Sequence, residues 1–302
     1  MEKKRVSMRQ IAQECGCSLA AVSYALNRSG QGKISSATRL RIIETAKKLN
    51  YSPEGARRKR TDRAAILVTS APTGSVGRRV HLMDLAGELA EQLGQMSIQA
   101  VILEIGDLVK EWKRVQALSP DILFLLDGGS KAIDYVNPPC VQPVVFLDSD
   151  NKHSLYYKIL PDDAALKELA SRRLGAERLF LMTEAVRCAD RLALLTAGIP
   201  AADVYIHDGS ADMAEFLAAH RGCKGIVVGD LLAVEACRLF PAKDLAVVSA
   251  LDRPALFPPE LTVLSVPNRL RAERAARVGQ DLLNLNYDHG ASTRILLGAG
   301  NK

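Results

Sequence analysis

The sequence predicts a small all-α N-terminal unit followed by a larger α/β body, and three observations carry this prediction. Residues 1–63 hold 15 Lys and Arg against 5 Asp and Glu, whereas residues 64–302 hold 25 against 29. Apolar residues in the N-terminal segment follow helical spacing. From residue 64 onward, short β-rich runs alternate with amphipathic helical stretches. That alternation is typical of parallel sheets with helices on both faces.

Length and composition exclude several classes of protein. At 302 residues the chain is long enough for two or three folding units. No apolar run approaches the roughly 20 residues of a membrane span, and the polar start lacks a signal peptide's apolar region, so we expect a cytoplasmic protein. The six cysteines have no paired spacing and indicate buried thiols, not a zinc site or disulfides. Without a GxSxG, P-loop or HExxH motif we expect neither catalysis nor a cofactor or metal.

The basic N-terminal segment carries a net charge of +10, against −4 for the rest of the chain. A compact basic segment favours binding to a polyanion, because contact with phosphates releases condensed counterions. Charge alone is equally compatible with a solubilising arm or a membrane-surface arm. The motifs within the segment are needed to choose between polyanion binding, a solubilising arm and a membrane-surface arm.

Two short helices are predicted first. Ser7 and Gln10 have the spacing of a capping box that begins a helix, and Gly16 suits the left-handed turn that ends it. Ser18 then caps a second helix over Leu19 to Asn27. Two helices joined by a tight glycine turn form a helix-turn-helix, whose second helix can enter a major groove about 12 Å wide.

A third helix follows a polar loop. Ser35 or Ser36 caps it, and the apolar residues expected to close a three-helix core are Leu40, Ile43, Ala46 and Leu49. Three-helix units of this size also bind proteins, so the pattern favours DNA binding without excluding that alternative.

The N-terminal segment resembles the headpiece of LacI/GalR-type repressors. The matching residues are Val6 to Ala12, Gly16, Ser18, Ala21 to Ser23, Leu26, Asn27, Ile34, Ser35, Thr38, Arg39 and Leu49 to Pro53. The resemblance implies base-edge contacts for Leu19, Ala20 and Tyr24. It implies phosphate contacts for Ser18, Ser23, Asn27, Ser35, Thr38 and Tyr51, and it also places Met8 and Arg9 at the DNA.

One segment departs from the family pattern. Arg60 stands where the family's hinge helix has a leucine that wedges into the minor groove, and it follows a run that includes Arg57 and Arg58. A guanidinium is unsuited to wedging but is attracted to a narrowed minor groove. The other interpretation is a flexible basic linker that contacts phosphates only.

The body yields seven strand and seven helix predictions. The expected strands are Ala65 to Thr69, Ile98 to Leu103, Ile122 to Leu126, Val144 to Leu147, Leu179 to Met182, Gly225 to Val228 and Leu245 to Val248. The expected helices are Leu82 to Leu93, Leu108 to Ala117, Ala164 to Leu174, Arg191 to Ala197, Met213 to Ala219, Leu231 to Leu239 and Leu270 to Leu285.

The body also resembles the family's two-lobed, periplasmic-binding-protein-like core. The matching segments are Ile159 to Ala165, Arg191 to Ala193, Gly229 to Ala233 and Pro259 to Val263. The resemblance implies an effector site between the lobes, with Arg191, Asp230 and Asp252 contacting a small polar metabolite such as a sugar. Gly229, Leu251 and Leu194 replace residues that the family usually has there. In the alternative, Arg191 and Asp230 form an interlobe ion pair, while Asp163 caps a helix.

The combined prediction is a three-helix helix-turn-helix headpiece (1–52), a basic linker (53–63) and a two-lobed α/β core (64–302). The resemblance implies a bacterial, nucleoid-associated repressor that binds double-stranded palindromic operator DNA as a homodimer and has no membrane partner. Two alternatives stay open. One is a regulator controlled by a protein or by no effector, and the other is a cytoplasmic sugar-binding module, which would have no need of the basic segment.

Overall fold

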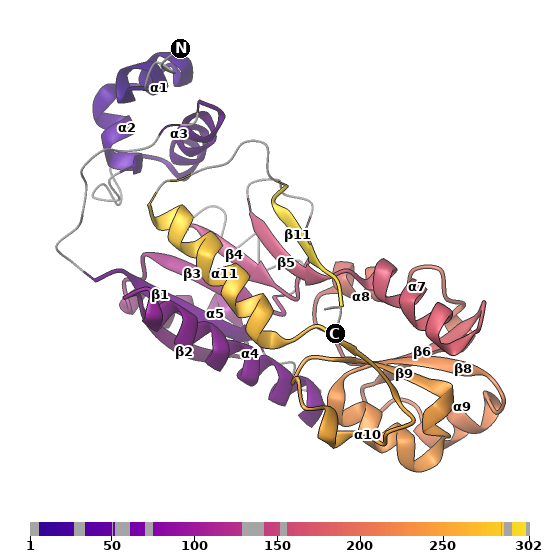
Figure 1. The fold of residues 1–302 in the computed structure, drawn as a ribbon. Helices are drawn as coiled ribbons and strands as arrows, with labels where there is room; N and C mark the ends of the chain where they lie inside the picture. Colours follow the sequence, from indigo (N-terminus) through magenta and orange to yellow (C-terminus); the bar gives the residue numbers. More distant parts are fainter. Residues whose placement is uncertain are drawn as a thin grey trace.

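The computed structural model describes residues 6–26, 34–49, 51, 61–69, 75–128, 142–151, 156–284, 286 and 292–299. They form a three-helix headpiece and two α/β lobes, each built on one parallel sheet (Figure 1). This arrangement confirms the predicted fold class. No helix in these ranges has the length and apolar character that a membrane span requires.

The headpiece consists of α1 (Met8–Cys15), α2 (Leu19–Leu26) and α3 (Ser36–Lys48). The predicted capping box begins α1, with Ser7 accepting from the Gln10 backbone and the Gln10 side chain accepting from the Ser7 backbone. The helix ends at Gly16, whose φ of 59° lies in the left-handed region where glycine carries no Cβ penalty. The tight turn between α1 and α2 therefore follows from the sequence.

The third helix packs inward through Ile42 in place of the predicted Ile43, whereas the predicted Ala46 and Leu49 do contribute to the headpiece core. Ile42 and Ala46 are fully buried in the headpiece core, whereas Ile43 is only half-buried. Ile42 and Ala46 are four residues apart and share a helix face, which Arg39 joins one turn earlier. The Arg39 guanidinium donates to the carbonyl oxygen of Tyr24 at 3.2 Å. This bond between α3 and α2 agrees with the orientation of α3 in which Ile42, and not Ile43, enters the core.

Lobe 1 contains a six-stranded parallel sheet in the order β11-β5-β4-β3-β1-β2. Its strands are β1 (Arg63–Thr69), β2 (Gln99–Ile105), β3 (Ile122–Leu126), β4 (Val144–Leu147), β5 (Tyr157–Pro161) and β11 (Arg294–Leu297). Alternate strand residues face opposite sides, so Ile66 and Phe124 pack under α4 (Val76–Gln95) and α11 (Asn268–Leu283). Leu67 and Leu125 pack under α5 (Leu108–Ala117) on the other face.

Lobe 2 contains a five-stranded parallel sheet in the order β10-β9-β8-β6-β7. Its strands are β6 (Leu179–Glu184), β7 (Val204–His207), β8 (Lys224–Val228), β9 (Leu245–Ser249) and β10 (Thr262–Ser265). Helices α7 (Asp163–Leu174) and α8 (Ala189–Thr196) contribute to the apolar cluster on one face. Helices α9 (Met213–Ala219) and α10 (Asp230–Leu239) contribute to the cluster on the other.

The chain crosses between the lobes after β5 and again before α11 (Figure 1). At the first crossing the backbone N–H of Asp162 donates to the Leu297 carbonyl oxygen at 2.9 Å, and at the second the N–H of Asn268 donates to that of Ala250 at 2.8 Å. The carboxyl ends of β4 in lobe 1 and of β6, β8 and β9 in lobe 2 lead into the cleft between the lobes. Open parallel sheets place their binding sites at this position.

Candidate nucleic-acid interface and interlobe cleft

The second helix of the headpiece presents its predicted base-reading residues outward. Leu19 has an exposed fraction of 46%, and Ala20 is exposed beside it. Tyr24 and Ser23 are half-buried on the same short helix. The opposite face packs into the headpiece core through Val22 and its neighbours. An exposed apolar side chain at this position is available to contact base edges, where thymine methyl groups accept apolar contacts.

Several predicted phosphate contacts lie at helix N-termini. The Ser18 hydroxyl accepts from the Ala21 N–H at 3.1 Å, which caps α2 as the sequence predicted. Ser35 accepts from the Thr38 N–H at 3.1 Å, and the two hydroxyls lie 2.8 Å apart at the start of α3. Helix N-termini attract phosphate because their first N–H groups lack intrahelical partners. The hydroxyl groups of Ser18, Ser35 and Thr38 therefore lie at helix N-termini, where phosphate contacts are expected.

The remaining predicted DNA contacts differ in their exposure. Arg9 is exposed, and Met8 is half-buried against the headpiece core. The ring of Tyr51 is buried in that core, with an exposed fraction of 6%, and burial raises the pKa of its hydroxyl. Asn27, Arg57, Arg58 and Arg60 lie outside the described residues, so the two interpretations of the basic linker stay open.

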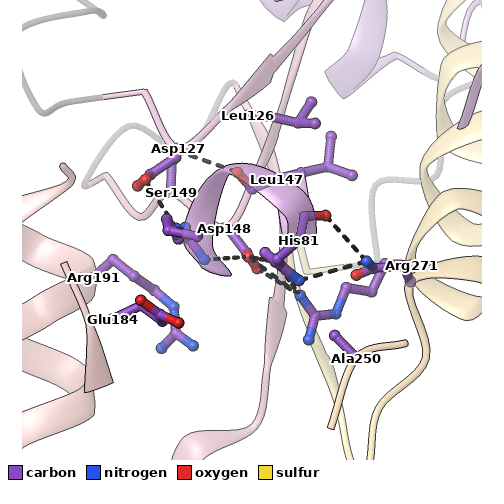
Figure 2. A network of polar contacts seen from close by, with 12 residues as sticks. His81, Leu126, Asp127, Leu147, Asp148, Ser149, Glu184, Arg191, Ala250 and Arg271 are labelled. Atoms are coloured by element: carbon purple, nitrogen blue, oxygen red, sulfur yellow. Dashed lines mark hydrogen bonds and ion pairs between the residues drawn. The ribbon is translucent and has the colours of Figure 1, made fainter. Parts of the chain in front are cut away.

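A buried carboxylate, Asp148, is the centre of the polar network in lobe 1 (Figure 2). It follows β4 and contacts Arg78 Nη1 at 3.2 Å, His81 Nε2 at 2.7 Å and Arg271 Nη1 at 3.1 Å. Burial raises the pKa of the Asp148 carboxyl, but the charge of Arg271, the hydrogen bond from His81 and the charge of Arg78 together hold it well below its ordinary value. Asp148 is therefore ionised at neutral pH and binds three donors at once.

His81 takes part in this network as a neutral ring. Burial lowers the pKa of His81, and the charges of Arg271 and Arg78 lower it further. The hydrogen bond to Asp148 and the charge of Asp148 act in the opposite direction. With Nε2–H donating to Asp148, Nδ1 is left to accept from the Asn268 amide at 3.4 Å. Asn268 also donates to Asp84 at 2.8 Å. These bonds connect α4 to α11 and hold the imidazole in one orientation.

A second carboxylate, Asp127, follows β3 and links the two lobes. It accepts from Arg78 Nε at 3.1 Å within lobe 1 and from the backbone N–H of Arg187 in lobe 2 at 3.2 Å. Its own carbonyl oxygen accepts from the Thr69 hydroxyl at 2.6 Å, at the end of β1. The two carboxylates raise the pKa of Arg78 more than burial lowers it. Asp127 and Asp148 both have a φ of 51°, a left-handed conformation that Asp and Asn tolerate better than most residues.

Two of the predicted effector contacts, Arg191 and Asp230, lie in the cleft but pair with other groups. Arg191 forms an ion pair with Asp163, with Nη2 and Oδ1 2.8 Å apart. Burial lowers the pKa of Arg191 to about 10. Asp230 accepts from the Ser249 hydroxyl at 2.5 Å and from the Ala250 N–H at 3.0 Å.

The structure corrects two sequence interpretations here. An Arg191–Asp230 pair is not formed, and α7 is capped by Asp162 instead of Asp163. The carboxylate of Asp163 instead pairs with the buried guanidinium of Arg191. The third predicted contact, Asp252, is exposed, accepts from the Ser265 hydroxyl at 3.4 Å, and is not among the residues that line the cleft.

Glu184, at the end of β6, reaches from lobe 2 to lobe 1. Its exposed fraction is 5%, and its carboxylate contacts the hydroxyl of Ser75, the N-cap of α4. Burial raises the pKa of the Glu184 carboxyl, and the bond from Ser75 acts in the opposite direction. Together with Arg78, Arg191 and Arg271 it fills the cleft and leaves a cavity of about 40 Å³. Within the described residues, no three His, Cys, Asp or Glu side chains converge on a metal-sized site.

Comparison with known protein families resolves what the headpiece is. Residues 7–54 match the family of bacterial regulatory proteins named lacI, and they include the capping box, the glycine turn and the outward face of α2. The headpiece is therefore similar to that of the bacterial regulatory proteins of the lacI family.

Solved structures share the fold of this chain along nearly its whole length. The Lac repressor dimer bound to operator and the anti-inducer ONPF has a TM-score of 0.62 at 17% identity, with 97% of this chain and 96% of that chain covered. The CelR–cellobiose complex has a TM-score of 0.59 at 18% identity, with 97% of each chain covered. A regulator from Corynebacterium glutamicum has a TM-score of 0.54 at 18% identity, with 99% and 98% covered. Comparison with curated proteins finds no match.

Sequence reasoning missed most of the residues that fill the interlobe cleft. The residues missed are Arg78, His81, Asp148, Glu184 and Arg271, which line the cleft, and Asp127, which bonds to Arg187 of lobe 2. A signal for two of them was present, because Asp127 and Asp148 directly follow predicted strands, where parallel sheets place their polar sites. Arg78 and His81 lie in α4, which begins at Val76, but they precede the predicted helix start at Leu82 and were not assigned to an element.

Proposed function

We propose that this chain is a LacI-type transcriptional regulator that binds a palindromic DNA operator as a homodimer, with α2 in the major groove, and that it acts as a repressor. The observation that carries the proposal is the outward face of α2, where Leu19 and Ala20 are exposed on a helix whose other face is buried. A single eight-residue helix reads only a half-site, so sequence-specific affinity needs two headpieces. The division into headpiece, residues 1–52, linker, residues 53–63, and core, residues 64–302, belongs to the same proposal.

An apolar stripe on α4 supports a second copy of this chain as the partner. Val76, Val80 and Met83 are exposed by 75%, 39% and 38%, and their spacing puts them on one face of the helix. Leu270, on the neighbouring α11, is exposed by 39%. Exposed apolar side chains grouped on one face are typical of interfaces. We therefore assign the dimer contact to this stripe.

The dimer assignment is tested by sedimentation of the full chain. Val80→Glu should shift the protein to monomers and weaken operator binding, because it places a charge in the apolar contact. Val109→Glu is the matched control, since Val109 is an exposed valine on α5 with an exposed fraction of 49%. Equal sedimentation of both variants would remove the stripe from the interface.

The DNA assignment is tested by selection from random duplexes. Replacing Leu19 and Ala20 together should change the selected base pairs, because only contacts to base edges carry sequence information. Gln13→Ala, an exposed position on α1, is the control that should leave the selected sequence unchanged. Affinity should also fall with salt at a slope of about −0.9 for each phosphate contacted. An unchanged operator after the α2 substitutions would refute the placement of this helix.

The cleft favours a second candidate for how the regulator is controlled. The expected sugar effector needs a pocket of roughly 300 Å³ or more, whereas the lobes enclose a cavity of about 40 Å³. Most of the polar groups that a sugar would use are engaged with one another, although Arg78 Nη2 and Arg271 Nε are buried without a hydrogen-bond partner. This observation supports a regulator that is controlled by another protein or by no effector. Calorimetry against a panel of sugars and nucleosides decides between the two, since heat of binding at a one-to-one ratio would restore the sugar prediction.

A further inference from the structure

Glu184 bonds to a side chain of the opposite lobe, whereas Asp127 accepts only a backbone N–H from lobe 2. Asp148 pairs with cations of its own lobe, and Asp230 bonds to Ser249 of its own lobe. The Glu184 carboxylate instead leaves β6 of lobe 2 and contacts the Ser75 hydroxyl of lobe 1. Its exposed fraction of 5% shows that the carboxylate lies inside the closed cleft and not at its rim.

Two glycines allow this carboxylate to fit between the lobes. A Cβ at Gly77, in the first turn of α4, would lie 2.0 Å from Glu184 Oε1. A Cβ at Gly229, the N-cap of α10, would lie 2.7 Å from Glu184 Cγ, and the φ of 133° at Gly229 also favours glycine. The side chain is thus enclosed by the first turn of one helix from each lobe. The N-terminal ends of helices carry partial positive charge and stabilise a carboxylate.

The contacts around Glu184 are those expected of a bound small carboxylic acid. The carboxylate has a hydroxyl donor in Ser75, lies at two helix N-termini and is shielded from water by both lobes. Arg187 adds a second connection between the lobes nearby, through its backbone N–H to Asp127 and its guanidinium to the Gly106 carbonyl oxygen at 2.9 Å. The chain therefore supplies, from its own β6, the group that would bridge the lobes.

We propose that Glu184 is a tethered ligand that holds the two lobes closed, so that the closed state of the core needs no free small molecule. Lobe closure by Glu184 is a property of the core alone, whereas its effect on operator affinity rests on the proposed function. In a dimer, closed lobes fix the positions from which the two linkers leave. Glu184 would thus keep the regulator in one DNA-binding state under all metabolite conditions.

The proposal is tested on the full chain with Glu184→Ala. This change deletes a CH₂–COO⁻ group, and acetate has the same atoms apart from one hydrogen. Amide hydrogen exchange in the first turns of α4 and α10 should become faster by about tenfold, the change expected for one lost buried hydrogen bond. Solution X-ray scattering should show a larger radius of gyration. Acetate, compared with chloride at equal ionic strength, should reverse both changes in the variant and leave the wild type unaffected.

Controls separate closure from general destabilisation. Glu235→Ala removes an exposed glutamate from α10 and should change neither exchange nor scattering. Gly77→Ala keeps Glu184 but occupies its place, and should open the lobes although alanine favours the helix. Combined with Glu184→Ala, it should have no additional effect. If Glu184→Ala fails to fold, Gly77→Ala alone decides the test.

Exchange and scattering that stay at wild-type values in both Glu184→Ala and Gly77→Ala would overturn the proposal, as would an acetate effect of equal size in the wild type. Operator binding is measured in parallel by gel shift. Loss of closure without any DNA binding by the wild type would refute the proposed function and leave the role of Glu184 standing.

Discussion

Replacing Asp148 by asparagine removes one charge from the most highly connected group in the cleft. Asparagine tolerates the left-handed backbone that Asp148 adopts at φ 51°, so the change tests the charge and not the turn. Arg271, with an exposed fraction of 3%, loses its carboxylate partner, and Arg78 keeps only Asp127. Removing one partner of a buried ion pair typically costs about 3–5 kcal/mol, because the remaining charge stays buried.

For a unit of this size that cost corresponds to a fall in Tm of about 6–20 °C, at about 2–4 °C for each kcal/mol. Differential scanning calorimetry of the full chain measures it, with urea unfolding as a second assay. Glu104→Gln is the matched control, because Glu104 pairs with Arg79 at 2.9 Å on the surface, where such a pair contributes about 0–1 kcal/mol. A loss for Asp148→Asn no larger than for Glu104→Gln would refute the reasoning.

The dependence of this loss on pH has a definite sign. The folded-state pKa of Asp148 is well below its ordinary value of 3.8, so its contribution is fully present at neutral pH. As the pH falls below 3.8, the unfolded chain takes up a proton that the folded protein resists, and the difference in stability between wild type and variant should shrink. A difference that grows on acidification would contradict the assignment of the charge to Asp148.

Three further predictions concern single side chains. Burial lowers the pKa of His81, so the free energy of unfolding should decrease as the pH falls through 6.5, and His81→Gln should remove that component in urea unfolding. Burial raises the pKa of Glu184, so the wild type should lose stability relative to Glu184→Gln as the pH rises above 4.5, measured in the same assay. Gly225→Ala should cost about 1–3 kcal/mol through overpacking, because its Cβ would lie 2.2 Å from the Phe180 ring, whereas Gly87→Ala meets no atom within 4 Å and should not destabilise.

Elements with a strong local pattern were predictable from the sequence. Strands β3 and β4 agree with the expected bounds, because they are fully buried and read as continuous apolar runs. Helix α5 agrees as well, since it is amphipathic and begins at the cap of Asp107. The capping box and the glycine turn of the headpiece were equally local, and they were confirmed.

Strands β5, β7, β10 and β11 were not among the expected strands. β5 contains Lys158, which is buried and donates to the Asn151 carbonyl oxygen at 3.0 Å, and it ends at Pro161. Neither residue favours a strand locally, so tertiary contacts determine the element. β11 lies at the edge of its sheet, where alternate residues stay exposed and the apolar run is interrupted.

The polar partners in the cleft could not be assigned from the sequence because they come from segments far apart in the chain. Asp148 and Arg271 are 123 residues apart, and Ser75 and Glu184 are 109 apart. A resemblance to a family identifies positions that relatives use for ligands, which is how Arg191 and Asp230 were found. The resemblance does not reveal that Arg191 pairs with Asp163 and that Asp230 accepts from Ser249 in this chain.

The hydroxyl bond at the end of β1 bears on how the core communicates with the headpiece. β1 begins at Arg63, next to the linker, and ends at Thr69, whose hydroxyl donates to the carbonyl oxygen of Asp127. Seven residues of strand span about 20 Å, and β2 and β3 flank this strand on both sides with continuous pairing. A strand paired on both sides in this way resists bending, so that a displacement at one end is transmitted to the other. Asp127 also accepts a hydrogen bond from the Arg187 N–H. A shift of lobe 2 would therefore displace the Thr69 end of β1 and move the linker at the Arg63 end.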